Sequence, residues 1–345
     1  MFDELYTRSI QLPTLLQQRI IILDGAMGTM IQRYNFNEAA YRGELFRNFT
    51  HDVKGNNELL SLTQPRVISE IHDQYFEAGS DIVETNTFGA TSIAQSDYGM
   101  EHLVIDMNVE SAKLACVSAA KYTTLDKPRF VAGAIGPTPK TASISPDVND
   151  PGARNISFDE LRDAYYAQAK ALLDGGVDLF LVETIFDTLN AKAALFALDM
   201  LFEDTGENLP IMISGTVTDA SGRILSGQTV EAFWNSLRHA KPLTFGLNCA
   251  LGAALMRPYI AELARFCDTY ISCYPNAGLP NPMSDTGFDE TPDVTSSLLS
   301  EFAESGLINV AGGCCGTTPD HITKIAKRLY GLKPRILRNC REGIN

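Results

Sequence analysis

Three cysteines have the spacing and surroundings of a metal site. Cys314 and Cys315 are adjacent within the stretch GGCCG, which follows a short apolar run and precedes a predicted helix start, and Cys249 ends another apolar run. Three thiolates leave a tetrahedral Zn²⁺ with one open position, which is typical of a catalytic site. Adjacent side chains bind one ion only if the backbone bends sharply between them, which the flanking glycines permit. We therefore expect all three thiolates to bind Zn²⁺, because a disulfide between chain neighbours would be strained.

Acidic, amide and hydroxyl side chains end most of the other apolar runs. Burying a carboxylate costs free energy unless something cationic is bound beside it, and no Lys or Arg adjoins the acids in the sequence. We therefore expect these side chains to bind a substrate, although hydrogen bonds from backbone N–H groups are an alternative explanation for each acid. The candidate substrate-binding residues are Asp24, Glu84, Asn86, Glu183, Ser214 and Asn248.

Short β-branched runs alternate with longer segments of helical periodicity, which is typical of a parallel α/β fold. Ser157 with Glu160, and the Thr-Pro pairs at 291–292 and 318–319, mark predicted helix starts. Eight βα units in about 300 residues predict a (β/α)8 TIM barrel, with an open doubly wound sheet as the alternative. Active sites of such barrels lie at the C-terminal ends of the strands, where the reactive side chains fall. The predicted strands are 20–24, 81–85, 130–136, 178–184, 211–217, 243–249, 269–276 and 308–314.

The barrel is expected to be a single domain over residues 20–331. It would follow an N-terminal extension (1–19) and precede a C-terminal tail or the start of an interdomain linker (332–345). The connections 25–64 and 137–157, after the first and third strands, are long for βα loops. Both are expected to lie over the mouth of the barrel, where they can contribute to the site.

Asn276 is the predicted fourth ligand of the ion in the absence of substrate. It ends the seventh strand, which should lie between the strands that carry Cys249 and Cys314, so its side chain should reach the ion from between them. Its amide offers a neutral oxygen, and Ala277 and Gly278 after it would let the loop shift during ligand exchange. We expect the substrate to displace this oxygen.

Composition and charge exclude several kinds of partner. The 345 residues include 28 Lys and Arg against 42 Asp and Glu, and the net charge of -14 disfavours binding to nucleic acid. No apolar run approaches the roughly 18 residues that a membrane span needs, and the first residues lack a signal-peptide pattern. We expect a cytoplasmic protein with neither nucleic acid nor a membrane as partner.

Eight motifs between about residues 20 and 331 resemble the homocysteine-binding barrel of cobalamin-dependent methionine synthase. GGCCG with an earlier Asn-Cys pair is shared by the wider family of zinc homocysteine S-methyltransferases, which includes betaine-dependent and S-methylmethionine-dependent members. The loops SISPDVNDP and SGTVTDASGR favour the methionine-synthase branch, so the chain resembles either its first module or a free-standing homologue. The motifs are LDGAMGTMIQ, ETNTFGAT, GPTPKTASISPDVNDP, VETIFDTLNAKAA, MISGTVTDASGRILSGQT, FGLNCALG, PNAGLP and GGCCGTTPDHI.

The resemblance implies the homocysteine half-reaction of a 5-methyltetrahydrofolate-homocysteine methyltransferase. Homocysteine would accept a methyl group from methylcobalamin, which a cobalamin-binding module or partner protein would hold, and methionine would form. Zn²⁺ would deprotonate the substrate thiol, which is then the nucleophile itself, so no protein nucleophile is expected. Asp24 and Glu183 would bind the substrate ammonium group.

Three alternatives stay open. A stand-alone homocysteine S-methyltransferase would use another donor, such as S-methylmethionine or betaine. A homocysteine-binding module would be inactive without cobalamin partners. A zinc hydrolase would use a metal-bound water, but hydrolytic zinc sites favour His and carboxylate ligands over three thiolates.

Overall fold

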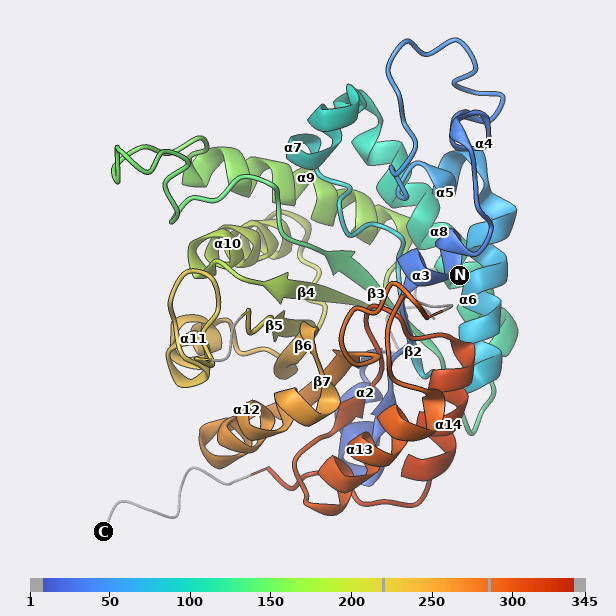
Figure 1. The fold of residues 1–345 in the computed structure, drawn as a ribbon, viewed down its shortest axis with the longest axis vertical. Coiled ribbons are helices and arrows are strands. Elements are labelled where there is room, and N and C mark those ends of the chain that lie inside the picture. Colours follow the sequence, from blue (N-terminus) through green and yellow to red (C-terminus); the bar gives the residue numbers. More distant parts are fainter. Residues whose placement is uncertain (1–8, 219–220, 285–286, 338–345) are drawn as a thin grey trace.

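Eight parallel strands form a barrel at the centre of the molecule (Figure 1). The computed structural model describes residues 9–218, 221–284 and 287–337. Strand pairing follows the order β1-β8-β7-β6-β5-β4-β3-β2, and a parallel bridge between Leu23 and Ile82 brings β2 back to β1. The predicted (β/α)8 barrel is confirmed, and each predicted strand overlaps an observed one. The strands are β1 (Ile21–Ile22), β2 (Ile82–Glu84), β3 (Phe130–Ile135), β4 (Leu179–Ile185), β5 (Ile211–Gly215), β6 (Thr244–Gly252), β7 (Tyr270–Asn276) and β8 (Val310–Ala311).

Helices surround the barrel, and the three predicted helix starts are confirmed. Ser157 and Glu160 form a capping box at the start of α9, and the hydroxyl of Thr291 accepts the Val294 N–H at the start of α13. At α14 the backbone N–H of Thr318 donates to the ring of His321. The helices are α2 (Leu12–Gln18), α3 (Met27–Gln32), α4 (Glu38–Arg42), α5 (Leu60–Thr63), α6 (Pro65–Ala78), α7 (Ser92–Gln95), α8 (Val104–Tyr122), α9 (Phe158–Gly175), α10 (Thr188–Thr205), α11 (Val230–Leu237), α12 (Ala253–Phe266), α13 (Pro292–Glu304) and α14 (Pro319–Leu329).

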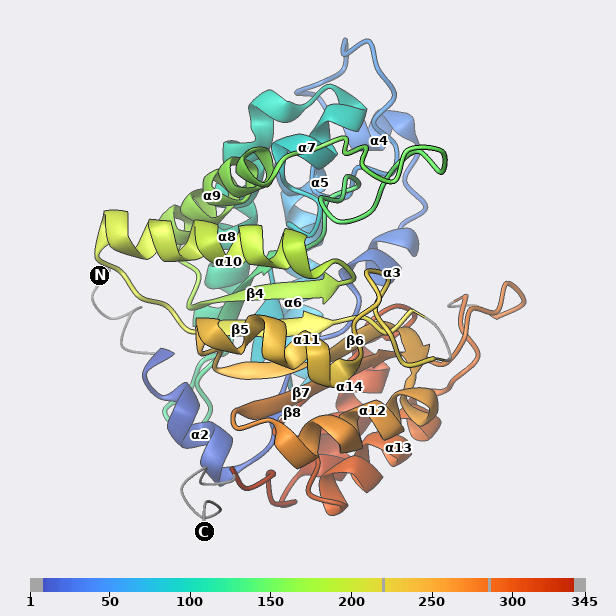
Figure 2. The ribbon, with the colours of Figure 1, turned by 90° about the vertical axis from the view of Figure 1, so that its left-hand side faces the viewer.

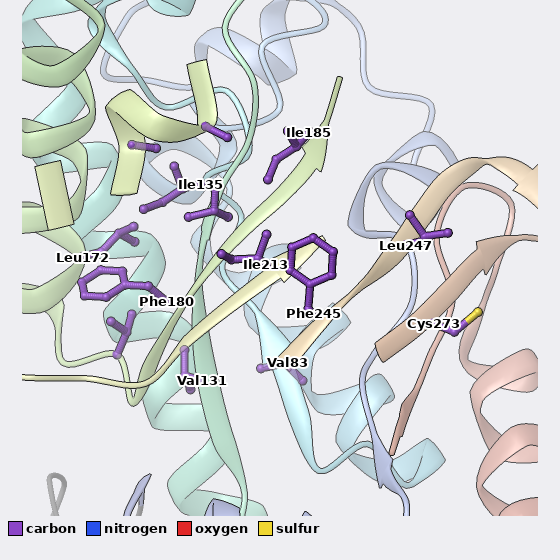
Figure 3. Packing of buried hydrophobic residues seen from close by; sticks show 14 of the residues in the cluster. Val83, Val131, Ile135, Leu172, Phe180, Ile185, Ile213, Phe245, Leu247 and Cys273 are labelled. Atoms are coloured by element: carbon purple, nitrogen blue, oxygen red, sulfur yellow. The ribbon is translucent and has the colours of Figure 1, made fainter. Parts of the chain in front are cut away.

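Alternation along the strands divides the buried apolar residues into two cores. Residues such as Phe180 and Ile213 point outward and pack against the helices (Figure 3). Their chain neighbours Leu179, Leu181 and Met212 point inward and fill the barrel. Successive strand residues point to opposite faces, so the two-residue period determines which side chains face the barrel interior.

Helix α2 closes the N-terminal end of the barrel. Leu12 and Leu16 are buried in the inner core together with strand residues. At the other end of the chain the guanidinium group of Arg335 donates to the backbone oxygens of Cys267 and Thr269. Parts of the expected extension and tail therefore pack on the barrel, whereas Cys340 and the outer parts of both lie outside the described residues.

Three polar side chains, each just before a strand, accept hydrogen bonds from backbone N–H groups of the preceding strand in the chain. Asp81, Asp178 and Asn309 stand directly before β2, β4 and β8. The stretches EAGSDIVET and DGGVDLFLVET share this aspartate. These bonds tie neighbouring strands together at the barrel end opposite the mouth. The bonds are Ile22 N–H to Asp81 (2.8 Å), Val131 N–H to Asp178 (2.8 Å) and Ile271 N–H to Asn309 (2.9 Å).

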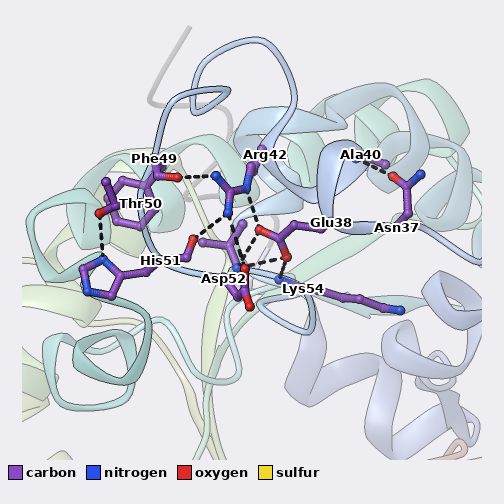
Figure 4. A network of polar contacts seen from close by, with 10 residues as sticks. Asn37, Glu38, Ala40, Arg42, Phe49, Thr50, His51, Asp52 and Lys54 are labelled. Carbon is purple, nitrogen blue, oxygen red and sulfur yellow. Dashed lines mark hydrogen bonds and ion pairs between the residues drawn. The ribbon is translucent and has the colours of Figure 1, made fainter.

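The long connection after β1 contains α3, α4 and α5. The carboxylate of Glu38 accepts the N–H groups of Val53 and Lys54, and Arg42 donates to Glu38 and to the backbone oxygen of Phe49 (Figure 4). This network fastens α4 to residues 49–54 of the same connection.

The long connection after β3 spans 137–157 without a helix. Figure 2 shows that β4 points toward the side where this connection lies, and that α2 lies at the opposite end. Asp187 accepts the N–H and hydroxyl of Ser143, and Asn190 accepts the N–H of Ala142. The start of α10 therefore holds this loop beside the C-terminal ends of the strands. No helix in the described part of the chain is both long and apolar enough to span a bilayer.

Candidate active site

The inward positions change from apolar to polar at the C-terminal ends of the strands. On β4 the inward residues are Leu179, Leu181 and then Glu183, and on β5 Met212 is followed by Ser214. The same two-residue period places Glu84, Asn248 and Asn276 on the inner side of β2, β6 and β7. The predicted site residues on five different strands are therefore directed toward one mouth.

A distortion of β6 places Cys249 on the same side as Asn248. Cys249 and Ala250 have φ angles of 59° and 57°, and the register with β7 shifts between Asn248 and Gly252. In a regular strand an inward Asn248 would send Cys249 outward. Because two successive residues have left-handed backbone conformations, this alternation is broken and the Cys249 sulfur can join the sulfurs of the other two cysteines.

The GGCCG stretch makes the sharp bend that the adjacent cysteines require. Gly316 has a φ of 80°, and a Cβ atom there would lie 2.4 Å from the ring of Phe288. The Cys314 N–H donates to the Pro275 oxygen at 2.8 Å, and the Cys315 oxygen accepts the Ala277 N–H at 2.9 Å. Both cysteines are thereby held against the end of β7, beside Asn276.

The three predicted thiols form one cluster. All three sulfur atoms lie within 4.8 Å of one another, and the Cys249 and Cys315 sulfurs are 3.9 Å apart. Hydrogen bonds from the other two thiols lower the pKa of Cys249 to about 3, whereas the bond to Cys249 raises the pKa of Cys315 to about 12 and that of Cys314 well above its usual value.

Asn276 stands beside this cluster with an oxygen that has no partner. Its side chain is 4% exposed, and its Oδ1 atom is buried without a hydrogen bond. The Asn276 side chain also hydrogen-bonds Cys249 and helps to lower the pKa of that thiol. A buried amide oxygen without a partner costs free energy, so this atom is available to a ligand. The bond that lowers the pKa of Cys249 is one that the amide nitrogen donates, so an ion at the three sulfurs would meet the Asn276 oxygen only with the amide group in the opposite orientation.

Asp24, Glu84 and Glu183 form a cluster of carboxyl groups. The Asp24 carboxylate accepts the Glu84 N–H at 3.0 Å through one oxygen, and its other oxygen has no partner. Glu84 and Glu183 hydrogen-bond each other through their side chains. Within the described chain no Lys or Arg forms an ion pair with any of the three.

Burial and repulsion between neighbouring charges raise the pKa values of all three carboxyl groups. Burial, followed by the charges of the neighbouring carboxylates, raises the pKa of Asp24 and of Glu84 well above their usual values. Burial also raises the pKa of Glu183 to about 8, and the charge of Cys249 contributes to the increase. The carboxyl cluster and the thiol cluster are thus within electrostatic reach of each other, and a bound cation would relieve the repulsion.

The remaining predicted residues already have partners within the protein. Asn86 donates to the Asn57 backbone oxygen at 2.8 Å and to the Ser61 hydroxyl at 3.2 Å, so it holds the long connection after β1 against β2. The Ser214 hydroxyl donates to the Asn248 side-chain oxygen at 2.7 Å. Both residues help to form the walls of the site.

Tyr274 and Thr184 are site residues that the sequence-based prediction missed. The Tyr274 hydroxyl lies 3.5 Å from a Glu183 carboxylate oxygen and also hydrogen-bonds Ser214. Thr184 follows Glu183 with a φ of 55°, and its hydroxyl accepts a hydrogen bond from Asn248. Tyr274 precedes Asn276 by two residues on the same strand, so the two-residue period could have identified it. No local signal marks the conformation of Thr184.

The other described cysteines and His321 lie away from the thiol cluster. Cys273 is buried in the outer core, Cys267 caps the end of α12, and Cys116 donates to the Gly176 backbone oxygen. The His321 ring accepts from Thr318 at the start of α14 and contacts the Glu290 backbone oxygen. These side chains therefore have structural partners.

Comparisons with known proteins identify the family and the fold. The model of the homocysteine S-methyltransferase family matches residues 21–329. Crystal structures of the homocysteine methyltransferase MmuM from Escherichia coli in its oxidised and metallated forms share the fold, with TM-scores of 0.70 and 0.69 and 21% identity. Each match covers 92% of this chain and 99% of that chain. Because the family match extends over most of its length, the chain belongs to the homocysteine S-methyltransferase family.

Proposed function

We propose that this protein is a zinc-dependent homocysteine S-methyltransferase that forms methionine. The observation that carries the proposal is the meeting of two clusters at one barrel mouth. One is three thiols that can hold a metal, and the other is three carboxyl groups that form no ion pair with a Lys or Arg of the described residues. Homocysteine carries a thiol and an ammonium group at the two ends of a short chain, so one molecule can meet both clusters.

Cys249, Cys314 and Cys315 would hold Zn²⁺, with the Asn276 oxygen as the fourth ligand until the substrate arrives. A bound Zn²⁺ would supply one thing, a substrate sulfur that stays deprotonated at neutral pH, where a free thiol with a pKa of about 8.5 is mostly protonated. The unpartnered Asn276 oxygen and the sulfur distances support this set of ligands. The backbone bends around Cys249 and Gly316 keep the three sulfurs in place before any ligand binds.

Asp24 and Glu183 would bind the ammonium group, and Glu84 would support them. The Asp24 oxygen without a partner can accept one ammonium hydrogen, and the Glu183 carboxylate can accept another. A positive charge among the three carboxyl groups lowers their pKa values and favours their ionised forms. Ser214, Asn248 and Asn86 then bound the space around the substrate.

The proposed methyl donor is methylcobalamin, held by a separate module or partner protein. Methylcobalamin would supply the methyl group to the substrate sulfur, and the cobalt would keep both electrons of the broken cobalt–carbon bond. This assignment rests on the loops that resemble the methionine-synthase branch.

A small donor such as S-methylmethionine or betaine is the second candidate. One observation favours it: the matched E. coli homocysteine methyltransferase aligns over 99% of its own chain, so a single barrel of this size forms that whole protein. The donor would then enter the mouth unaided.

Metal analysis and donor assays test the proposal. We expect about one Zn²⁺ per chain after growth with zinc, and formation of methionine when homocysteine and the correct donor are supplied. Parallel reactions with methylcobalamin, S-methylmethionine and betaine distinguish the donors, and formation of cob(I)alamin is followed by its absorption. A zinc-loaded protein that methylates homocysteine with none of the three donors would contradict the proposed activity.

A further inference from the structure

The side chain of Asn248 occupies the junction between the two clusters. It is fully buried, and it stands directly before Cys249 in the chain. Its oxygen accepts the Thr184 N–H at 3.1 Å and the Ser214 hydroxyl at 2.7 Å. Its nitrogen donates to the Thr184 hydroxyl at 2.8 Å and lies 3.9 Å from the Cys314 sulfur. All four hydrogen-bonding positions of the amide therefore have a partner in the protein.

The partners also determine which way the amide faces. The Thr184 backbone N–H can only donate, so the atom that it meets must be the oxygen of Asn248. The nitrogen is then directed toward the Thr184 hydroxyl and the Cys314 sulfur. With the opposite orientation two donors would face each other in a buried site, which costs about 1–3 kcal/mol.

These contacts join the residues that bind the two ends of the proposed substrate. Thr184 follows Glu183, and its left-handed backbone is stabilised by two bonds to the Asn248 amide. The same amide contacts Cys314. One side chain therefore relates the position of an ammonium-binding carboxylate to that of a metal-binding sulfur.

We propose that Asn248 is a positioning residue, which donates an N–H···S hydrogen bond to Cys314 and holds Thr184 in place, instead of binding the substrate itself. This inference rests on the proposed function, since it assigns the Cys314 sulfur to a metal. The hydrogen bond withdraws negative charge from the Cys314 thiolate and keeps its side chain in one orientation. Partners of this kind commonly contribute 10- to 100-fold to metal affinity.

Cobalt substitution tests the role, because sulfur-to-Co²⁺ charge-transfer absorption reports directly on the thiolates. The proteins to compare are the wild type, Asn248→Ala, and Ser214→Ala, which removes one anchor of the amide without touching a thiol. Asn309→Ala is the matched control, since Asn309 is also a fully buried amide bonded to backbone groups, at the other end of the barrel. Co²⁺ affinity is measured against a competing chelator, and thermal unfolding shows that each variant is folded.

We expect Asn248→Ala to bind Co²⁺ about 10- to 100-fold more weakly, with the charge-transfer band at longer wavelength, because a thiolate without the hydrogen bond is easier to oxidise. Ser214→Ala should shift both quantities less, in the same direction, and gives a result even if Asn248→Ala fails to fold. Asn309→Ala should lose stability and keep wild-type affinity and spectrum.

Two results would overturn the inference and leave the proposed function intact. One is unchanged metal affinity and an unshifted band in folded Asn248→Ala, or in Ser214→Ala if only that variant folds. The other is weaker binding of homocysteine by Asn248→Ala with an unaltered metal site, which would make Asn248 a substrate contact. A wild-type protein that binds no Co²⁺ would instead refute the proposed metal site, and the inference with it.

Discussion

Replacing Glu183 by Gln removes the negative charge that Glu183 would carry beside a bound ammonium group, and it keeps the shape of the side chain. Glu183 is 5% exposed, so its bond to a substrate ammonium group would form away from water. A hydrogen bond between charged groups contributes about 1.5–3 kcal/mol, and about 1.4 kcal/mol corresponds to tenfold in affinity. We therefore expect the dissociation constant of homocysteine to rise by about one to two decades.

A substrate analogue isolates the part of this loss that belongs to the ammonium group. Isothermal titration of the metal-loaded protein compares homocysteine with 4-mercaptobutyrate, which has the same thiol and carboxylate but no amino group. The substitution should weaken the binding of homocysteine strongly and that of 4-mercaptobutyrate little, since the analogue makes no bond to Glu183. Glu58→Gln is the control, because Glu58 is a carboxyl group of raised pKa that accepts the Gly89 N–H outside the cluster.

An equal loss for both ligands would refute the reasoning, because the effect would then come from a disturbed site and not from a missing charge. An unchanged constant for homocysteine would also reject Glu183 as an ammonium ligand. Glu58→Gln should bind homocysteine like the wild type.

Four further outcomes are expected. Cys315→Ala should lose most of its zinc on metal analysis, whereas Cys273→Ala, which changes a buried thiol of the outer core, should retain it. Asn276→Ala should bind zinc more weakly in chelator competition, and added homocysteine should reduce that difference because its sulfur replaces the lost oxygen. Asp81→Ala should lower the free energy of unfolding in urea by about 3 kcal/mol, because it removes the acceptor of the Ile22 N–H and the partner of Arg19. The Arg19 guanidinium donates to Asp81 at 2.7 Å. An unchanged midpoint of urea unfolding would contradict the role given to these contacts. Burial lowers the pKa of His72 to about 4 in the folded protein, below its usual value near 6.5. Between these two pH values the unfolded chain binds more protons than the folded protein. The free energy of unfolding should therefore rise with pH across this window, by about 3 kcal/mol in all. His72→Leu should show a smaller rise in urea titrations at several pH values.

The sequence alone predicted the barrel, and it predicted the strand ends at which the candidate site residues lie. Apolar runs of strand length separated by helical segments predict eight βα units, and each capping pattern acts within a few residues of the chain. The two-residue period of a strand then decides that Glu84, Glu183 and Ser214 lie on the inner side, at the ends where barrel sites form. These inferences need only local spacing.

The tertiary structure decided how the side chains at the mouth meet. The two-residue period of a strand alone would place Cys249 on the face opposite Asn248. Only the left-handed backbone conformations at the end of β6 bring its sulfur to the other thiols. The Asn276 oxygen without a partner, and the Asn248 amide whose hydrogen-bonding positions all have partners, likewise depend on atoms that are distant in the chain. Spacing along one strand determines which face a side chain occupies, whereas the partner that it meets depends on how the neighbouring strands and loops pack around it.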